Sequence, residues 1–277
     1  MSGLGLRWLG VVFITMILAA CGASRDGAPS HVPKDISSIP DAVPKDEPLS
    51  KYGNPRQYEV LGKNYYTLAS AEDYHEKGIA SWYGTKFHGR RTSSGEIYDM
   101  YAMTAAHKTL PLPTYVEVTN LKNGRKVVVK VNDRGPFHAD RLIDLSYAAA
   151  KKLGIVATGT GLVEIRTVTP ASAKRDSATQ VASRSQPVAW TKPVKSASSA
   201  QIFLQVGAFS SRYLAEQVKI RLQQNVSSSG INIMPYTAAN NTLYRVRVGP
   251  LSSVEQGDNL AGQLVGLGFY DSHIIVE

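Results

Sequence analysis

A stretch rich in alanine, serine and threonine over residues 171–200 divides this chain of 277 residues into parts that cannot share one core. Residues 76–170 before it are dense in valine, isoleucine and tyrosine, and residues 201–277 after it again alternate apolar and polar positions. Single domains usually hold about 100–200 residues. We therefore expect two modest domains joined by a basic linker.

The first 20 residues indicate export. Arg7 is their one charge, and it precedes an apolar run shorter than the ~20 residues that span a membrane, which predicts a secretory signal peptide. Cys21, the only cysteine, follows in the run LAACG, which resembles the bacterial lipobox and implies lipidation at Cys21. The alternative is an ordinary signal peptide with a chance cysteine. One cysteine excludes an internal disulfide and a cysteine-rich zinc site.

The segment after the cysteine, residues 21–75, holds six prolines and no sustained periodicity. We expect it to be a lipid-anchored, largely disordered tether. Gly22 in place of aspartate after the cysteine resembles the sorting signal for the outer membrane. The domains would then lie on the periplasmic face of that membrane.

Basic residues exceed acidic ones by 31 to 22, so the net charge of +9 indicates an anionic partner. The excess lies in residues 76–170, with 14 basic against 8 acidic side chains, and in residues 171–200, with five against one. Residues 201–277 are balanced at five against five. For an exported chain we expect an anionic polymer of the cell envelope and no nucleic acid.

Residues 76–170 predict a small barrel of strands with one short helix. Four apolar or alternating runs are typical of strands, at residues 79–83, 115–118, 126–131 and 162–166. A helix over residues 148–153 would begin at an N-cap of either Asp144 or Ser146 and end at Gly154.

Four ionisable residues of this domain lie in loops or at strand ends, where a scaffold presents functional groups: Glu96, Asp99, His107 and Asp133. Each also has a purely structural interpretation. Glu96 and Asp99 could be solvated turn residues, Asp133 could bond its own turn, and His107 could be a satisfied core histidine. Spacing alone leaves these interpretations open.

Four blocks of this domain, in order, resemble the rare lipoprotein A (RlpA) family: GIASWYG at 78–84, FHGRRTSSGE at 87–96, AMTAAH at 102–107 and VNDRGPF at 131–137. The resemblance implies a double-psi β-barrel and a septal lytic transglycosylase that cuts peptide-stripped (denuded) peptidoglycan glycan strands. It also implies that Glu96, Asp99 and Asp133 are essential carboxylates and that His107 is functionally important.

Glycosidic cleavage needs a proton donor and stabilisation of a positively charged transition state. Our hypothesis makes Asp133 the acid/base group, with Glu96 and Asp99 raising its pKa or stabilising charge, and His107 orienting one of the carboxylates. Exchanged roles for Glu96 and Asp133 are the rival hypothesis.

Substrate contacts can be proposed from residue type. Trp82 and Tyr83 would stack on sugars, or else pack in the core; Arg90, Arg91 and Arg134 would bind muramic carboxylates, or else form a solvated basic face. The six histidines show no metal-ligand spacing, and no phosphate-binding loop or nucleophile elbow occurs. We expect no metal and no cofactor.

Residues 201–277 follow the pattern βαββαβ of a ferredoxin-like domain, with helices at 211–224 and 252–267, the second opening on a capping box at Ser252. The blocks QVGAF at 205–209 and YRVRVGP at 244–250 resemble the SPOR domain, which implies binding of denuded glycan at the septum. Strand alternation predicts an open sheet face that carries Phe203, Gln205, Arg245 and Arg247.

Two functions from different classes follow. The first is an endolytic transglycosylase on denuded glycan that forms 1,6-anhydro-muramic ends and aids daughter-cell separation. The second is a non-catalytic, wall-loosening or glycan-binding lipoprotein of the expansin type. Either would be held to the membrane through Cys21 and enriched at the division septum, where association with the divisome or a cell-wall amidase is expected.

Overall fold

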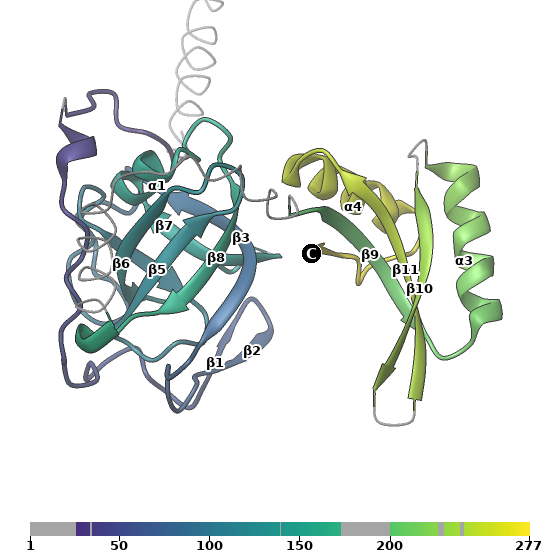
Figure 1. The fold of residues 1–277 in the computed structure, drawn as a ribbon, viewed down its shortest axis with the longest axis horizontal. Helices are drawn as coiled ribbons and strands as arrows, with labels where there is room; N and C mark the ends of the chain where they lie inside the picture. Colours follow the sequence, from purple (N-terminus) through teal and green to yellow (C-terminus); the bar gives the residue numbers. More distant parts are fainter. Residues whose placement is uncertain (1–25, 34, 139, 173–199, 227–229, 239–240) are drawn as a thin grey trace, which may run out of the picture.

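The computed structural model describes residues 26–33, 35–138, 140–172, 200–226, 230–238 and 241–277 (Figure 1). Cys21, the signal sequence and residues 173–199 of the linker lie outside the described residues, so the expectations for them remain predictions.

Residues 75–167 form a closed barrel of six strands, in the order β3-β7-β4-β6-β5-β8. Strand β3 runs parallel to β7, and β4 runs parallel to β6, whereas all other neighbouring strands are antiparallel. This mixture of directions fits the double-psi barrel that the resemblance implied, and the fold prediction is confirmed. The strands are β3 (His75–Tyr83), β4 (Thr104–His107), β5 (Thr114–Asn120), β6 (Lys126–Asp133), β7 (Arg141–Ser146) and β8 (Gly161–Thr167).

Alternating apolar residues fill the barrel. Val116 and Val118 of β5 meet Val129 and Val127 of the neighbouring β6 in register, and all four are at most 1% exposed. Strands of period two bury every second side chain, so the outward positions of the same strands are free to carry charge. Lys130 and Asp133 of β6 are among the less buried residues of that strand.

The single barrel helix α1 (Tyr147–Leu153) begins at Ser146, whose side chain accepts a hydrogen bond of 3.2 Å from the Ala149 N–H. It ends at Gly154, which has the left-handed φ of 77° that glycine tolerates. Asp144, the other N-cap considered, instead lies within β7 and accepts a hydrogen bond from Ser81.

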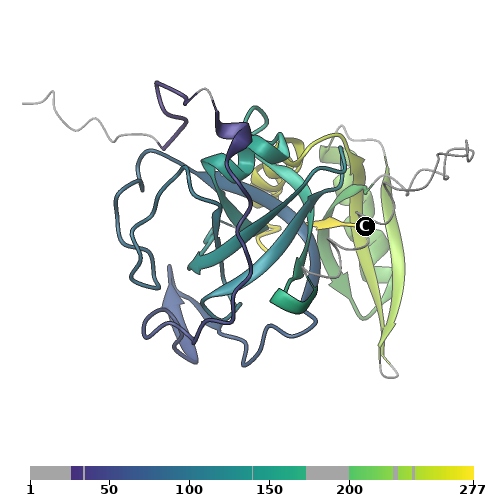
Figure 2. The same ribbon diagram turned by 60° about the vertical axis from the view of Figure 1, so that its left-hand side comes forward.

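Residues before the barrel pack against it, contrary to the disorder expected for residues 21–75. Asp41 accepts a hydrogen bond of 3.1 Å from the Val128 N–H, and Ser50 N–H donates to the Leu112 carbonyl at 2.8 Å. Figure 2 shows this segment, in purple, crossing the barrel from the short helix η1 (Ile36–Ser38). We call residues 47–54 the strap. A hairpin of β1 (Gln57–Val60) and β2 (Lys63–Tyr66) follows it.

Residues 202–276 form the second domain, a four-stranded antiparallel sheet in the order β10-β11-β9-β12, with helices packed on one face (Figure 1). This order and the βαββαβ sequence of elements confirm the ferredoxin-like prediction. The elements are β9 (Ile202–Phe209), α3 (Arg212–Asn225), β10 (Ile231–Ala238), β11 (Asn241–Leu251), α4 (Val254–Gly266) and β12 (His273–Val276).

The N-cap of α4 is Ser253, one residue after the predicted Ser252. The Ser253 side chain accepts from Gln256 N–H at 3.1 Å, and Gln256 reaches back to accept from Ser252 N–H at 2.8 Å. The capping partner is therefore Gln256 and not Glu255.

The two domains touch at the β12 edge and at α4. Ile274 N–H donates to the Asp140 carboxylate at 2.9 Å, and Asp258 pairs with Arg141 at 2.6 Å. Among the residues the structure describes, none of the helices has both the length and the apolar character needed to cross a membrane.

Candidate active site

The loop between β3 and β4 presents Glu96 on a tight turn. Thr92 N–H donates to the Glu96 carbonyl at 2.8 Å, and Gly95 N–H donates to the Thr92 carbonyl at 2.9 Å. Gly95 has a φ of +95°, a left-handed conformation that side chains other than glycine rarely adopt. The turn places the Glu96 side chain, 45% exposed, beside the outer face of β6.

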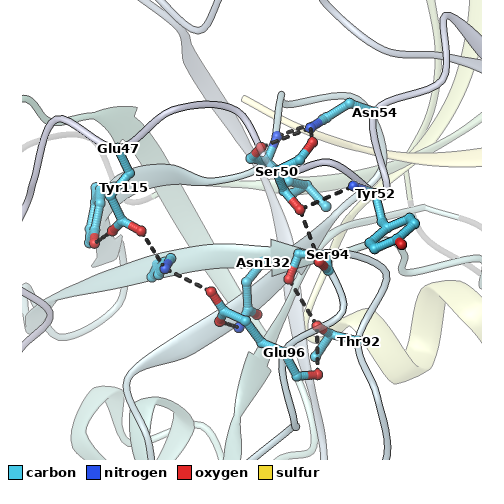
Figure 3. Close-up of polar contacts among 11 residues, drawn as sticks. Glu47, Ser50, Tyr52, Asn54, Thr92, Ser94, Glu96, Tyr115 and Asn132 are labelled. Atoms are coloured by element: carbon cyan, nitrogen blue, oxygen red, sulfur yellow. Dashed lines mark hydrogen bonds and ion pairs between the residues drawn. The ribbon is translucent and has the colours of Figure 1, made fainter.

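Two residues of β6 hold the Glu96 carboxylate (Figure 3). The Lys130 ammonium lies 2.8 Å from Oε1, and the Asn132 amide donates to Oε2 at 2.6 Å. The same Lys130 ammonium lies 2.9 Å from a carboxylate oxygen of Glu47, which belongs to the strap. Glu47 also accepts a hydrogen bond from the Tyr115 hydroxyl. Lys130 thus bridges two carboxylates.

This arrangement keeps Glu96 ionised. Partial burial acts to raise the pKa of Glu96, but the hydrogen bonds from Lys130 and Asn132 outweigh burial and hold the pKa below its usual value. A carboxylate in this state is suited to stabilising positive charge or accepting a proton, and is poorly suited to donating one at neutral pH.

Asp133, at the end of β6, is held differently. Its Oδ1 accepts three hydrogen bonds, from Ser93 N–H at 2.7 Å, Ser93 hydroxyl at 2.6 Å and Arg134 N–H at 2.8 Å. Among the described residues Oδ2 has no hydrogen-bond partner. Since Ser93 belongs to the Glu96 loop and Asn132 adjoins Asp133, one loop and one strand end bring both carboxylates into a single site.

Asp99 stands apart from this pair. Its Oδ1 accepts from Tyr101 N–H at 2.9 Å and lies 3.7 Å from Nδ1 of His88, and its side chain is 54% exposed. No hydrogen bond or ion pair joins it to Glu96 or Asp133 among the described residues, so Asp99 is not in contact with the two carboxylates.

His107 does not orient a carboxylate of the site, and this expectation was wrong. Its ring is 2% exposed, and Nδ1 accepts from Thr109 N–H at 3.2 Å and from Leu110 N–H at 3.1 Å. Nε2 therefore carries the proton and faces the Tyr74 hydroxyl at 3.2 Å. Burial, aided by Lys108 and Arg134, lowers the pKa of His107 to about 3. The ring is a neutral organiser of the turn after β4.

The two aromatic residues of β3 belong to the interior. Tyr83 is 7% exposed and stacks on Tyr98 with ring centroids 4.0 Å apart, so its predicted role in sugar binding was wrong. Trp82 is partly buried and packs edge-on against Tyr147, with centroids 5.6 Å apart. Tyr83, Tyr98 and Tyr147 belong to a small buried cluster beside the main barrel core, and Trp82 packs against it.

The Arg134 guanidinium is also engaged in hydrogen bonds within the protein. Its guanidinium donates to the carbonyls of Gly53 at 2.7 Å and His107 at 3.1 Å, and to the Asn54 side chain at 3.1 Å. The predicted contact of Arg134 with substrate carboxylates was wrong, because these donors bind the strap and the turn after β4. Arg90 and Arg91 are exposed, and Arg91 donates to the Gly95 carbonyl at 3.0 Å, next to Glu96.

The sequence reasoning missed the residues that hold the site: Ser93, Lys130, Asn132 and Glu47. A usable signal existed for Lys130, a charged residue between two buried valines of a strand, because such a position faces outward with a defined direction. No signal marked Glu47, which lies in a segment without periodicity.

Comparison with known proteins was decisive for the family. Residues 75–166 match the lytic transglycolase domain model, and residues 198–276 match the SPOR domain model. The endolytic peptidoglycan transglycosylase RlpA of Pseudomonas aeruginosa strain UCBPP-PA14 is 42% identical over 272 residues, which cover 84% of this chain and 79% of that protein. The protein of the same name from Vibrio cholerae is 40% identical over 271 residues, covering 95% and 94%.

The chain belongs to the RlpA family.

Among solved structures, the SPOR domain of RlpA from Pseudomonas aeruginosa aligns with 27% of this chain and 96% of its own, at 24% identity and a TM-score of 0.26. In the SPOR domain of the present RlpA family member, β9 and β11 expose the predicted open face. Phe203, Gln205 and Arg245 are partly exposed there, and Arg245 lies 3.5 Å from the centre of the Tyr236 ring.

Arg247 is not available on that face, and its assignment as an exposed ligand group was wrong. It is 5% exposed and pairs with Glu277, with Gln205 at 3.4 Å. The Glu277 carboxylate, directly after β12, thus neutralises the guanidinium. Tyr236, 43% exposed beside Arg245, is the aromatic residue that the prediction omitted.

Proposed function

We propose that this protein is an endolytic lytic transglycosylase that cuts denuded peptidoglycan glycan strands and leaves 1,6-anhydro-muramic ends. The observation that carries the proposal is the pair of carboxylates, Glu96 and Asp133, which one loop and one strand end bring into a single site. Lys130 keeps Glu96 charged, and Asp133 has one oxygen without a protein hydrogen bond.

In this mechanism the Asp133 carboxyl donates its proton to the glycosidic oxygen as the bond from that oxygen to C1 of the muramic residue breaks. The Glu96 carboxylate stabilises the positive charge that develops at C1. The C6 hydroxyl of the same muramic residue then attacks C1, and Asp133 accepts the hydroxyl proton. The anhydro ring closes and the acid is regenerated, so no water is consumed.

The SPOR domain would bind the denuded strand, with Phe203, Gln205 and Arg245 on its open face. Lipidation of Cys21 would hold the protein on the periplasmic face of the outer membrane, since burial of several acyl chains makes release slow. We place the protein at the division septum, where amidases that strip peptides from glycan supply its substrate and the divisome is the expected neighbour.

The test of the reaction is digestion of amidase-treated sacculi followed by mass spectrometry of the soluble glycans. We expect anhydro-ended, peptide-free glycans from the wild type. Asp133→Asn should lower the rate by about 10²–10⁴-fold, the usual contribution of a general acid. No product from the wild type would support instead the non-catalytic, expansin-like function, and full activity of Asp133→Asn would refute the assignment of the acid.

The test of targeting is deletion of residues 201–277. Septal enrichment of a fluorescent fusion should disappear, while cleavage of soluble glycan persists. An unchanged septal focus would contradict the targeting role.

A further inference from the structure

The barrel lacks the aromatic platform that the sequence predicted for it. Tyr83 and Tyr98 stack on each other inside, and Trp82 packs on Tyr147. An enzyme that acts on a sugar polymer needs surface on which pyranose rings can lie, and aromatic faces supply it. An exposed ring next to Glu96 would supply such a face.

That ring belongs to the strap. Tyr52 is 59% exposed, and its Cδ2 lies 3.5 Å from the position that a Cβ on Gly95 would occupy. Gly95 directly precedes Glu96, so the ring covers the turn that presents the carboxylate. A Cβ at position 95 would lie at ordinary van der Waals distance from the ring, so the Tyr52 ring and the Gly95 turn are close neighbours. Figure 3 shows Tyr52 beside Ser94.

The backbone under Tyr52 is fixed on both sides. The Ser50 hydroxyl donates to the Ser94 carbonyl at 2.9 Å and accepts from Tyr52 N–H at 3.3 Å. The Asn54 amide donates to the Leu112 carbonyl at 2.8 Å, and its oxygen accepts from Leu112 N–H at 2.8 Å. The Tyr52 ring is therefore held in a defined position and does not belong to a free tail.

Positive charge accompanies the ring. The Lys51 ammonium lies 5.5 Å from the centre of the Tyr52 ring, within the range of a cation–π contact. Arg91, which donates to the Gly95 carbonyl, is exposed. An aromatic face flanked by cations matches a sugar ring that bears a carboxylate.

We propose that the strap builds a saccharide subsite next to Glu96, in which the Tyr52 ring stacks on a pyranose and Lys51 binds the lactyl carboxylate of a muramic residue. This inference rests on the proposed function for the identity of the polymer. It makes a segment that precedes the barrel part of the substrate-binding surface and assigns it a role in affinity.

The first experiment is steady-state kinetics of the full chain on peptide-free glycan. Tyr52→Ala should raise KM about three- to tenfold and leave kcat nearly unchanged, because the ring contacts substrate away from the bond that breaks. Tyr52→Phe and Tyr52→Trp should restore KM, since both keep an aromatic face. Tyr213→Ala, at a 70% exposed tyrosine on α3, is the matched control and should behave as wild type. An unchanged KM for Tyr52→Ala overturns the inference.

The second experiment separates this inference from the proposed reaction. Hydrogen–deuterium exchange of full-length Glu96→Gln with peptide-free glycan should show protection of peptides covering residues 48–54 and 92–97, in addition to protection in the SPOR domain. Tyr52→Ala in that background should lose the first protection and keep the second. Protection without turnover in the wild type would refute the enzyme and retain the subsite. Protection confined to residues 201–277 would refute the subsite.

Discussion

Lys130 sets the charge state of the candidate site because it is shared by two carboxylates of different origin. Glu96 comes from the barrel loop and Glu47 from the strap, and both lie within 2.9 Å of one ammonium that is 18% exposed. The two partners also raise the pKa of Lys130 against the lowering effect of its burial. Removing Lys130 would therefore change the charge of the Glu96 side chain most at the pH where carboxylates titrate.

We predict that Lys130→Gln moves the acid limb of the pH–activity profile to higher pH. With the ammonium gone, burial and the repulsion from Glu47 raise the pKa of Glu96, so protonation removes its charge earlier as pH falls. Lys130→Arg should retain the wild-type limb. Lys126→Gln, on the same strand and paired with Glu117, is the control. Superimposable profiles for Lys130→Gln and wild type would show that Glu96 does not act as a carboxylate.

His107 gives a prediction about stability and not about catalysis. The unfolded histidine binds a proton below pH ~6.5, whereas the folded ring does so only near its pKa of about 3. The unfolded state thus holds more protons in this window, and the free energy of unfolding must fall as pH drops from 6.5 toward 3.

His107→Asn should lessen that fall, because asparagine can still accept from Thr109 and Leu110 N–H groups but does not titrate. Urea denaturation at pH 7.5 and pH 5.0 measures the difference, with His31→Asn as the control at an exposed histidine. An identical drop in His107→Asn and wild type would contradict the assignment of a buried neutral ring.

Among the structural elements, the strap is the one whose order the composition of the sequence did not predict. Proline-rich, aperiodic chain usually indicates disorder, but residues 47–54 gain their order from backbone groups of the barrel, which no local pattern records. Gly53 shows how closely they fit. It has a φ of +82°, and a Cβ there would lie 2.8 Å from the Ser93 carbonyl oxygen and 2.9 Å from Leu112.

We predict that Gly53→Ala destabilises the protein by about 1–3 kcal/mol more than Gly62→Ala. Gly62 has a similar φ of +74° but nothing within 4 Å of its would-be Cβ, so it isolates the cost of the conformation from that of the clash. Denaturant unfolding gives the difference, and limited proteolysis should cut the strap faster in Gly53→Ala. Equal stability of the two variants would mean that the strap does not pack tightly on Ser93.

The two barrel strands that the sequence did not predict, β4 and β7, were missed because their local signals are weak or masked. β4 is four residues long and reads Thr-Ala-Ala-His, with little β propensity, and β7 was obscured by the helix signal that follows it. Both form because their neighbours in the barrel, β6 and β3, offer parallel edges. Local propensity cannot report pairing between strands that are distant in sequence.

At the scale of the whole molecule, charge is divided between the two domains. The barrel region carries the excess of basic residues, and residues 201–277 are balanced. Long-range attraction of an anionic glycan should therefore depend on the barrel and its linker, while the SPOR sheet contributes through partly exposed Phe203, Gln205 and Arg245.

We predict that KM for peptide-free glycan rises severalfold between about 50 and 500 mM NaCl, because the Debye length falls from roughly 10 Å at 0.1 M to about 3 Å at 1 M, and exposed charges farther apart than this length are screened. The kcat should change little. A glycan whose lactyl carboxylates have been reduced to alcohols should show a higher KM that is insensitive to salt. Equal salt dependence for both glycans would show that the lactyl carboxylates are not the groups that the basic residues attract.

Local periodicity was enough to predict the two domains, the elements of the second domain, and four barrel strands with the barrel helix, because these depend on residues that are near one another in the chain. The family blocks pointed to Glu96 and Asp133 together. Only the tertiary structure decided what each side chain contacts. It buries Tyr83 and Arg247 and engages the Arg134 guanidinium in hydrogen bonds within the protein. It also separates His107 and Asp99 from the carboxylate pair, and brings Glu47 to Lys130 and Tyr52 to the Gly95 turn. Burial and hydrogen-bond partners are set by chain segments far apart in sequence, and closure of the barrel is what brings those segments together.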